Sequence, residues 1–223
     1  MNAQLIDAET GAHLWADQFD ADRADLLQMQ DEIVTRLARA MQIQLVAVDA
    51  ARVTRTRPGN LDAEDLALRC EAGVYNFPPG SAAYYAYDLC DRALHMDNGN
   101  VFALTGMTLS YIFPVVEAQS RDPQADIRRA DELVTRALAA DPNIYWAHFA
   151  KAWVLMAQGR TQEAVIEGER SLALNPSFID AYLALCAANN FLGRPDRALE
   201  LADNAIRLSP RDPHLRGLYH MKG

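Results

Sequence analysis

The sequence predicts an all-α fold, a solenoid of stacked helical hairpins that follows a small N-terminal β-hairpin and one long helix. Landmark residues recur every 34 positions in the C-terminal half of the chain. Apolar residues between these landmarks follow helical spacing, and glycine and proline stand where hairpin turns would fall. Residues 1–57 lack this period, so we expect them to form a separate segment.

The repeat is visible in four pairs of residues, each separated by 34 positions. They are Gly159 and Gly193, Ala164 and Ala198, Leu174 and Leu208, and Pro176 and Pro210. Glycine permits the tight turn between two helices, the alanine lets the helices pack closely, and proline ends the second helix because it cannot continue the hydrogen-bond ladder. In the clearest unit, the two helices should cover about 179–192 and 195–208.

Four units account for most of the chain after residue 58. They cover about 61–98, 101–142, 145–178 and 179–212, and a partial capping helix follows them. The second unit is about ten residues longer than the period, and the excess falls at 114–123, where we expect an insertion between its two helices.

The N-terminal segment contains a predicted hairpin and a predicted helix. Residues 2–7 and 13–19 are short strand-like runs on either side of Gly11, which suits a hairpin turn. Apolar residues then recur every three or four positions over 25–48, which predicts a long amphipathic helix. Residues 55–60 are expected to form the linker to the repeats.

Composition excludes several classes of partner. The chain has 223 residues, 50% of them hydrophobic, and a formal net charge of -9. Because a protein of this charge gains nothing from counterion release, we expect no nucleic-acid partner and no anionic membrane partner. No apolar run approaches a membrane span, and the first residues do not resemble a signal peptide. We therefore expect a cytoplasmic protein.

Cofactor, metal and disulfide sites are not expected. Cys70, Cys90 and Cys186 are widely spaced, without a C-x-x-C pair or a nearby histidine, so neither a disulfide framework nor a zinc site is predicted, and a reducing cytosol is the simplest setting. The acidic cluster over 20–31 lacks the glycine and glutamate of a calcium loop. No nucleophile, phosphate-binding or dinucleotide-binding motif occurs, so we expect no enzyme activity.

The landmarks of the 34-residue unit resemble those of the tetratricopeptide repeat (TPR) family. The run from Ala3 to Ala16, with Phe19-Asp20 and 30–33, resembles the end of the TolB-like segment of certain bacterial signalling proteins. In those proteins the segment joins an N-terminal class III adenylate/guanylate cyclase domain, or a winged-helix domain, to C-terminal TPRs. The resemblance implies that residues 1–57 end a TolB-like segment and that 58–223 form a TPR array.

The same resemblance implies a function. A TPR array of this kind would be a protein-protein interaction module in bacterial signalling, not itself catalytic, with a protein or peptide as its partner. The alternative is a regulatory C-terminal region that controls a fused adenylate cyclase domain outside this chain. The unit 145–178 departs from the family pattern at His148 and Lys151, which occupy usually apolar positions, so we expect it to pack less well.

The resemblance also places a candidate groove on one face of the first helix of each unit. Eight residues map to this face in the last two units: Trp146, Phe149, Trp153, Met156, Asp180, Leu183, Ala187 and Asn190. Large aromatic side chains favour interfaces because they supply much contact area at low entropy cost. The spacing of Trp146, Phe149 and Trp153 is equally typical of a buried helix stripe, and a two-residue shift of register would make them packing residues. The sequence leaves both interpretations open.

The N-terminal hairpin predicts a homodimer. A two-stranded hairpin is not stable alone in water, and its outer edges carry unpaired N–H and C=O groups. The hairpin could fold onto the helix over 25–48 or pair with the same strand of a second copy. We expect the second arrangement, because both faces of the hairpin are partly apolar.

Overall fold

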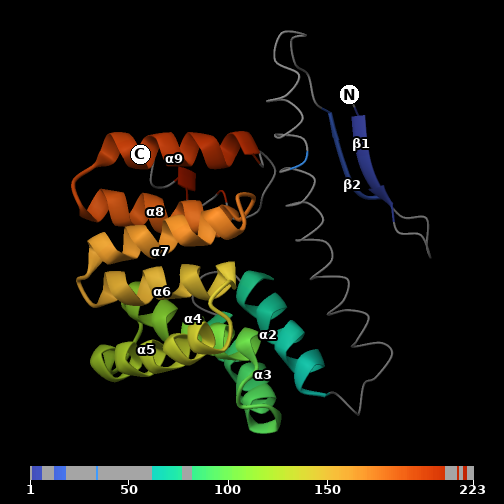
Figure 1. Ribbon diagram of the computed structural model, residues 1–223, viewed down its shortest axis with the longest axis vertical. Helices are drawn as coiled ribbons and strands as arrows, with labels where there is room; N and C mark the ends of the chain where they lie inside the picture. Colours follow the sequence, from blue (N-terminus) through green and yellow to red (C-terminus); the bar gives the residue numbers. More distant parts are fainter. Residues whose placement is uncertain are drawn as a thin grey trace.

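The computed structural model describes residues 2–6, 13–18, 34, 62–76, 82–208, 215 and 218–219. In these ranges the chain forms a two-stranded sheet and a series of helices (Figure 1). The strands are β1 (Asn2–Ile6) and β2 (His13–Gln18). The helices are α2 (Ala63–Asn76), α3 (Ala82–Met96), α4 (Val101–Val116), α5 (Pro123–Ala140), α6 (Tyr145–Ala157), α7 (Thr161–Leu174), α8 (Ile179–Phe191) and α9 (Pro195–Leu208).

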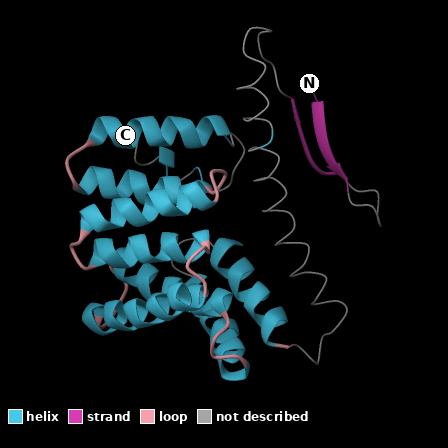
Figure 2. Cartoon of the chain, in the orientation of Figure 1, coloured by secondary structure: helices cyan, strands magenta, loops and turns pink. Residues whose placement is uncertain are grey.

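Successive helices pair as the hairpins α2/α3, α4/α5, α6/α7 and α8/α9, which stack on one another (Figures 1 and 2). This arrangement is the all-α hairpin solenoid that the sequence predicts. The turns inside the last two hairpins contain Gly159 and Gly193, whose φ angles of 76° and 69° lie in the left-handed region that favours glycine. The repeating glycines therefore mark turns, as their spacing indicates.

The extra residues of the second unit are only partly an insertion between helices. Helix α4 runs to Val116 and contains Pro114, so the first part of the excess lengthens the helix. Helix α5 begins with Pro123, and the Asp122 side chain caps it by accepting a hydrogen bond from the Ala125 N–H. The connecting loop is therefore shorter than the expected 114–123.

The larger share of the core residues comes from the first helices of the hairpins, and the second helices supply most of the rest. Helices α4 and α6 are buried on most of their surface, and one apolar cluster extends from α2 to α8. A second cluster joins α8 and α9 to Leu215 and Leu218. No helix in the described ranges is long and apolar enough to cross a membrane.

A disulfide joins Cys70 of α2 to Cys90 of α3, so the expectation of no disulfide is wrong. Packing of the two helices brings the Cα atoms within 5.2 Å, a distance that a disulfide can span. Gly106 of α4 lies against this bond, because a Cβ at position 106 would overlap the Cys70 sulfur. Cys186 is free and buried, and burial raises the pKa of its thiol to about 12.

The N-terminal hairpin is present. β1 pairs antiparallel with β2, with Asn2 opposite Gln18 and Leu5 opposite Trp15. The helix expected over 25–48 lies outside the described residues, apart from Val34, which is helical. The linker over 55–60 is also outside them, so the boundary at residue 57 stays a prediction.

Candidate partner-binding face

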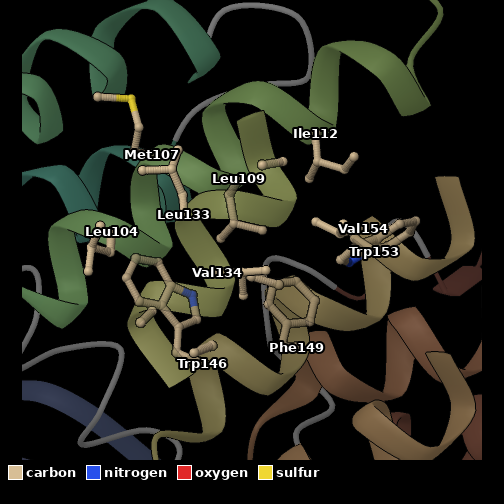
Figure 3. Packing of buried hydrophobic residues seen from close by; sticks show 14 of the residues in the cluster. Leu104, Met107, Leu109, Ile112, Leu133, Val134, Trp146, Phe149, Trp153 and Val154 are labelled. Atoms are coloured by element: carbon tan, nitrogen blue, oxygen red, sulfur yellow. The ribbon is translucent and has the colours of Figure 1, made fainter. Parts of the chain in front are cut away.

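The aromatic residues of the predicted groove lie in the core (Figure 3). Trp146 is 0% exposed, Phe149 4% and Trp153 6%. A side chain so enclosed cannot touch a partner in this conformation. Of the two interpretations that the sequence leaves open, the burial favours packing at these three positions.

These rings form contacts that tie successive hairpins together. Trp146 of α6 lies 6.3 Å from Phe102 of α4 between ring centroids, and Trp153 meets Phe113 of α4 edge-on at 6.1 Å. Phe149, on the same face of α6, meets Phe178, which precedes α8, at 5.3 Å and an interplanar angle of 85°. Edge-to-face aromatic pairs are favourable beyond the area that they bury. The stripe therefore stabilises the stacking of α4, α6 and α8.

The remaining groove residues divide into three groups by exposure. Asp180 and Ala187 are buried, Met156 and Leu183 are half-buried, and Asn190 is exposed. The accessible part of the predicted groove is therefore confined to the ends of α6 and α8 and the middle of α8.

Sequence reasoning missed one residue of this surface. Phe191 is 76% exposed, the highest value for a large hydrophobic side chain in the described ranges. Ala187 precedes Phe191 by four positions and Asn190 by three, so both residues are neighbours of Ala187 on α8. The signal available in the sequence was that Phe191 directly follows Asn190, one of the predicted groove residues. We call Met156, Leu183, Asn190 and Phe191 the α6/α8 face.

The expectation of poor packing at His148 and Lys151 is wrong. His148 is buried, with Nδ1 2.6 Å from Glu167 Oε2 on α7 and Nε2 2.9 Å from the Pro142 carbonyl oxygen. The Pro142 carbonyl oxygen can only accept, and an ionised Glu167 carboxylate also accepts, so with Glu167 ionised both ring nitrogens donate and the ring is an imidazolium. Lys151 Nζ lies 2.5 Å from Asp131 Oδ1 on α5. The polar residues therefore link α6 to its neighbours by charge.

The pair of His148 and Glu167 should make stability depend on pH. The hydrogen bond to Glu167 raises the pKa of His148 above 6.5, and the bond to His148 lowers the pKa of Glu167 below 4.5. The histidine contribution is fully present below its unfolded pKa and is lost as pH rises through the raised folded pKa. The glutamate contribution is present above its unfolded pKa and is lost as pH falls through the lowered one.

We therefore expect His148→Asn to destabilise the chain most between about pH 4.5 and 6.5, and by less as the pH rises above that window. Urea unfolding of both proteins over a pH series measures this difference. Glu169→Gln, which removes an exposed carboxylate from α7, the helix that carries Glu167, serves as the control. A deficit of His148→Asn that stays constant from about pH 5 to 9 would contradict an imidazolium at this position.

Comparison with known proteins identifies the fold. No family model matches the sequence. The structure is similar to that of TTC0263, a thermophilic TPR protein of Thermus thermophilus, with a TM-score of 0.62 and 17% sequence identity over 86% of this chain and 97% of that one. It is also similar to a mutant O-GlcNAc transferase of Thermobaculum terrenum, with a TM-score of 0.50 and 20% identity over 67% of this chain and 27% of that one.

The sequence is also similar to that of one curated protein. It is 30% identical over 166 residues to "Putative adenylate cyclase 3" of Rhizobium meliloti (strain 1021). The alignment covers 74% of this chain and 28% of the relative, so the chain spans little more than a quarter of that protein's length. The hairpin stack and its structural neighbours together show that this chain has the tetratricopeptide repeat fold.

Proposed function

We propose that this chain is a non-catalytic scaffold that binds a protein or peptide partner, in a bacterial signalling protein, through the α6/α8 face. The observation that carries the proposal is the exposure of Phe191 on α8, a helix that also carries the half-buried Leu183 and packs against α6, which carries the half-buried Met156. Aromatic residues and methionine are enriched at interfaces, and repeat arrays present extended surfaces to their partners. The fold supports the same role, because TPR arrays position such surfaces on successive first helices.

The experiment starts by isolating a partner from the native host with the full chain as bait and purifying it. Calorimetry then gives the Kd for the wild type, Phe191→Ala and Leu199→Ala, the last of which removes an exposed apolar side chain from α9. We expect Phe191→Ala to weaken binding at least about tenfold and Leu199→Ala to leave it unchanged. Both substitutions are at exposed sites, so the melting temperatures should barely change. Equal affinities for the two variants would refute the α6/α8 face as the binding surface.

A second candidate function is control of an adenylate cyclase domain joined to the TolB-like segment. The similarity to a protein named as an adenylate cyclase favours it. This candidate predicts that the coding sequence before Met1 encodes a class III cyclase domain, and that Phe191→Ala alters the cyclase activity of the whole protein. A native start at Met1 would exclude this candidate and leave the scaffold proposal intact.

The proposed scaffold is also a cytoplasmic homodimer, paired through the N-terminal hairpin. The described sheet has only the two strands β1 and β2, so each has an outer edge with no partner strand in the described ranges. Size-exclusion chromatography with light scattering, on the full chain and on a variant that lacks residues 1–24, tests the pairing. We expect a dimer that becomes a monomer on deletion. A dimer that survives the deletion must have another interface.

A further inference from the structure

A recess between α3, α4 and α5 lies apart from the buried rings of Trp146, Phe149 and Trp153 and from the α6/α8 face. Its volume is about 210 Å³. Met107 of α4, Leu133 of α5 and Leu94 of α3 form an apolar floor, and the first two are buried. An apolar cavity of about 150 Å³ can hold benzene, whereas pockets for drug-sized ligands run from about 300 to 1,000 Å³. The recess therefore has room for one ring or one branched side chain.

Two tyrosines stand at the wall of this recess. The hydroxyl oxygens of Tyr87 and Tyr111 lie 3.3 Å apart, and the rings meet edge-on at 5.7 Å. This hydrogen bond is the largest cause that raises the pKa of Tyr87 to about 12, so Tyr87 stays a phenol at neutral pH. Each tyrosine has one hydroxyl hydrogen, and one of these two hydrogens forms the hydrogen bond between the rings. The other hydrogen can be donated to a ligand.

The charged groups of the recess are predominantly basic, although the whole chain carries a formal charge of -9. Arg129 and Arg136 extend from α5, and Arg136 Nη2 donates to the Asn98 carbonyl oxygen at 2.5 Å, which leaves its other N–H groups available. Arg129 Nη1 lies 3.8 Å from Glu132 in a pair that is mostly exposed, and such pairs hold their members weakly. On α3, Asp91 lies 3.4 Å from His95 Nδ1. The recess is therefore lined by two guanidinium groups and by one carboxylate, that of Asp91, which lies near His95.

We propose that this recess binds an apolar monocarboxylate. The hydrocarbon part of the ligand fills the floor over Met107 and Leu133, and its carboxylate accepts hydrogen bonds from Arg129, Arg136 and a tyrosine hydroxyl. Guanidinium groups suit this ligand because their planar N–H fork matches the two oxygens of a carboxylate. The carboxylate belongs either to a free acid or to the C-terminal residue of a peptide. This site is independent of partner binding at the α6/α8 face.

The test uses the full chain with ¹³C-labelled methionine methyl groups, because Met107 reports from the floor of the recess. N-acetyl-leucine is titrated to about 20 mM, with N-acetyl-leucinamide as the uncharged match and a short peptide that ends in a free leucine as the third probe. The Met107 signal is assigned with Met107→Leu, and Met156 on α6 provides the internal reference. We expect a saturable shift at Met107 with both carboxylates and none with the amide. Tighter binding of the peptide than of N-acetyl-leucine would identify a peptide C-terminus as the source, and equal binding a free acid.

The variant Arg129→Gln/Arg136→Gln should weaken binding of N-acetyl-leucine at least about tenfold, the loss expected when charge-assisted hydrogen bonds are removed. Arg128→Gln, which removes an exposed arginine from the same helix outside the recess, should bind as the wild type does. A Met107 shift that is equal with acid and amide, or that persists unchanged in the double variant, overturns the proposal. The absence of any saturable shift does so as well.

Discussion

Trp153→Ala should lower the free energy of unfolding by about 3 to 5 kcal/mol, the usual cost of deleting a large buried aromatic side chain. Trp153 is buried between α4 and α6, where its ring meets Phe113 and Phe149 edge-on. Its loss leaves a cavity between two hairpins and removes both ring contacts. Urea denaturation followed by circular dichroism measures the change.

Phe191→Ala is the matched control for this prediction, because it truncates an aromatic side chain that is largely exposed. We expect it to change the free energy of unfolding by no more than about 0.5 kcal/mol. If Trp153→Ala changed the free energy of unfolding as little as this control, the packing role of Trp153 would be refuted. Trp153 would then again be a candidate groove residue.

Removal of the Cys70–Cys90 disulfide should cost about 3 kcal/mol, since the bond closes a loop of 20 residues in the unfolded chain. Cys70→Ala/Cys90→Ala removes the bond without adding polar atoms to the core. Thermal melting of this variant beside Cys186→Ala, which removes the free thiol, isolates the effect of the bond. Mass spectrometry after alkylation of the protein, unfolded in denaturant without a reductant, should find Cys70 and Cys90 protected and Cys186 modified.

Three alkylated cysteines would instead show that the thiols are reduced in the native protein. That result would agree with the reducing cytosol expected from the sequence, because disulfides persist mainly in oxidising compartments. The melting temperature of the double variant would then differ from the wild type only by the packing change at two buried positions.

Local signals explain why the helices could be predicted. The predicted helices 179–192 and 195–208 correspond to Ile179–Phe191 and Pro195–Leu208. Gly193 and Pro195 act within their own turn, so their effect does not depend on the rest of the fold. Pro114 shows the limit of this reasoning. It lies inside α4, where the sequence indicated a loop.

The candidate site was harder to predict because it depends on contacts between distant residues. The spacing of Trp146, Phe149 and Trp153 defines one helix face but does not say what covers it. Glu167 makes His148 tolerable in the core, and it lies 19 residues away without any motif. The disulfide likewise depends on how α2 packs against α3. Phe191 could be placed on the correct face from spacing alone, but its exposure could not.

Binding of a protein partner through the α6/α8 face is the function that we propose for this chain. Photo-crosslinking tests it most directly, with a photoreactive phenylalanine analogue placed at position 191 in one protein and at position 199 in another. Both positions are exposed, on α8 and α9, so the analogue should not disturb the fold of either labelled protein. We expect a crosslink to the purified partner from position 191 and none from position 199. Crosslinking from position 199 alone would contradict it.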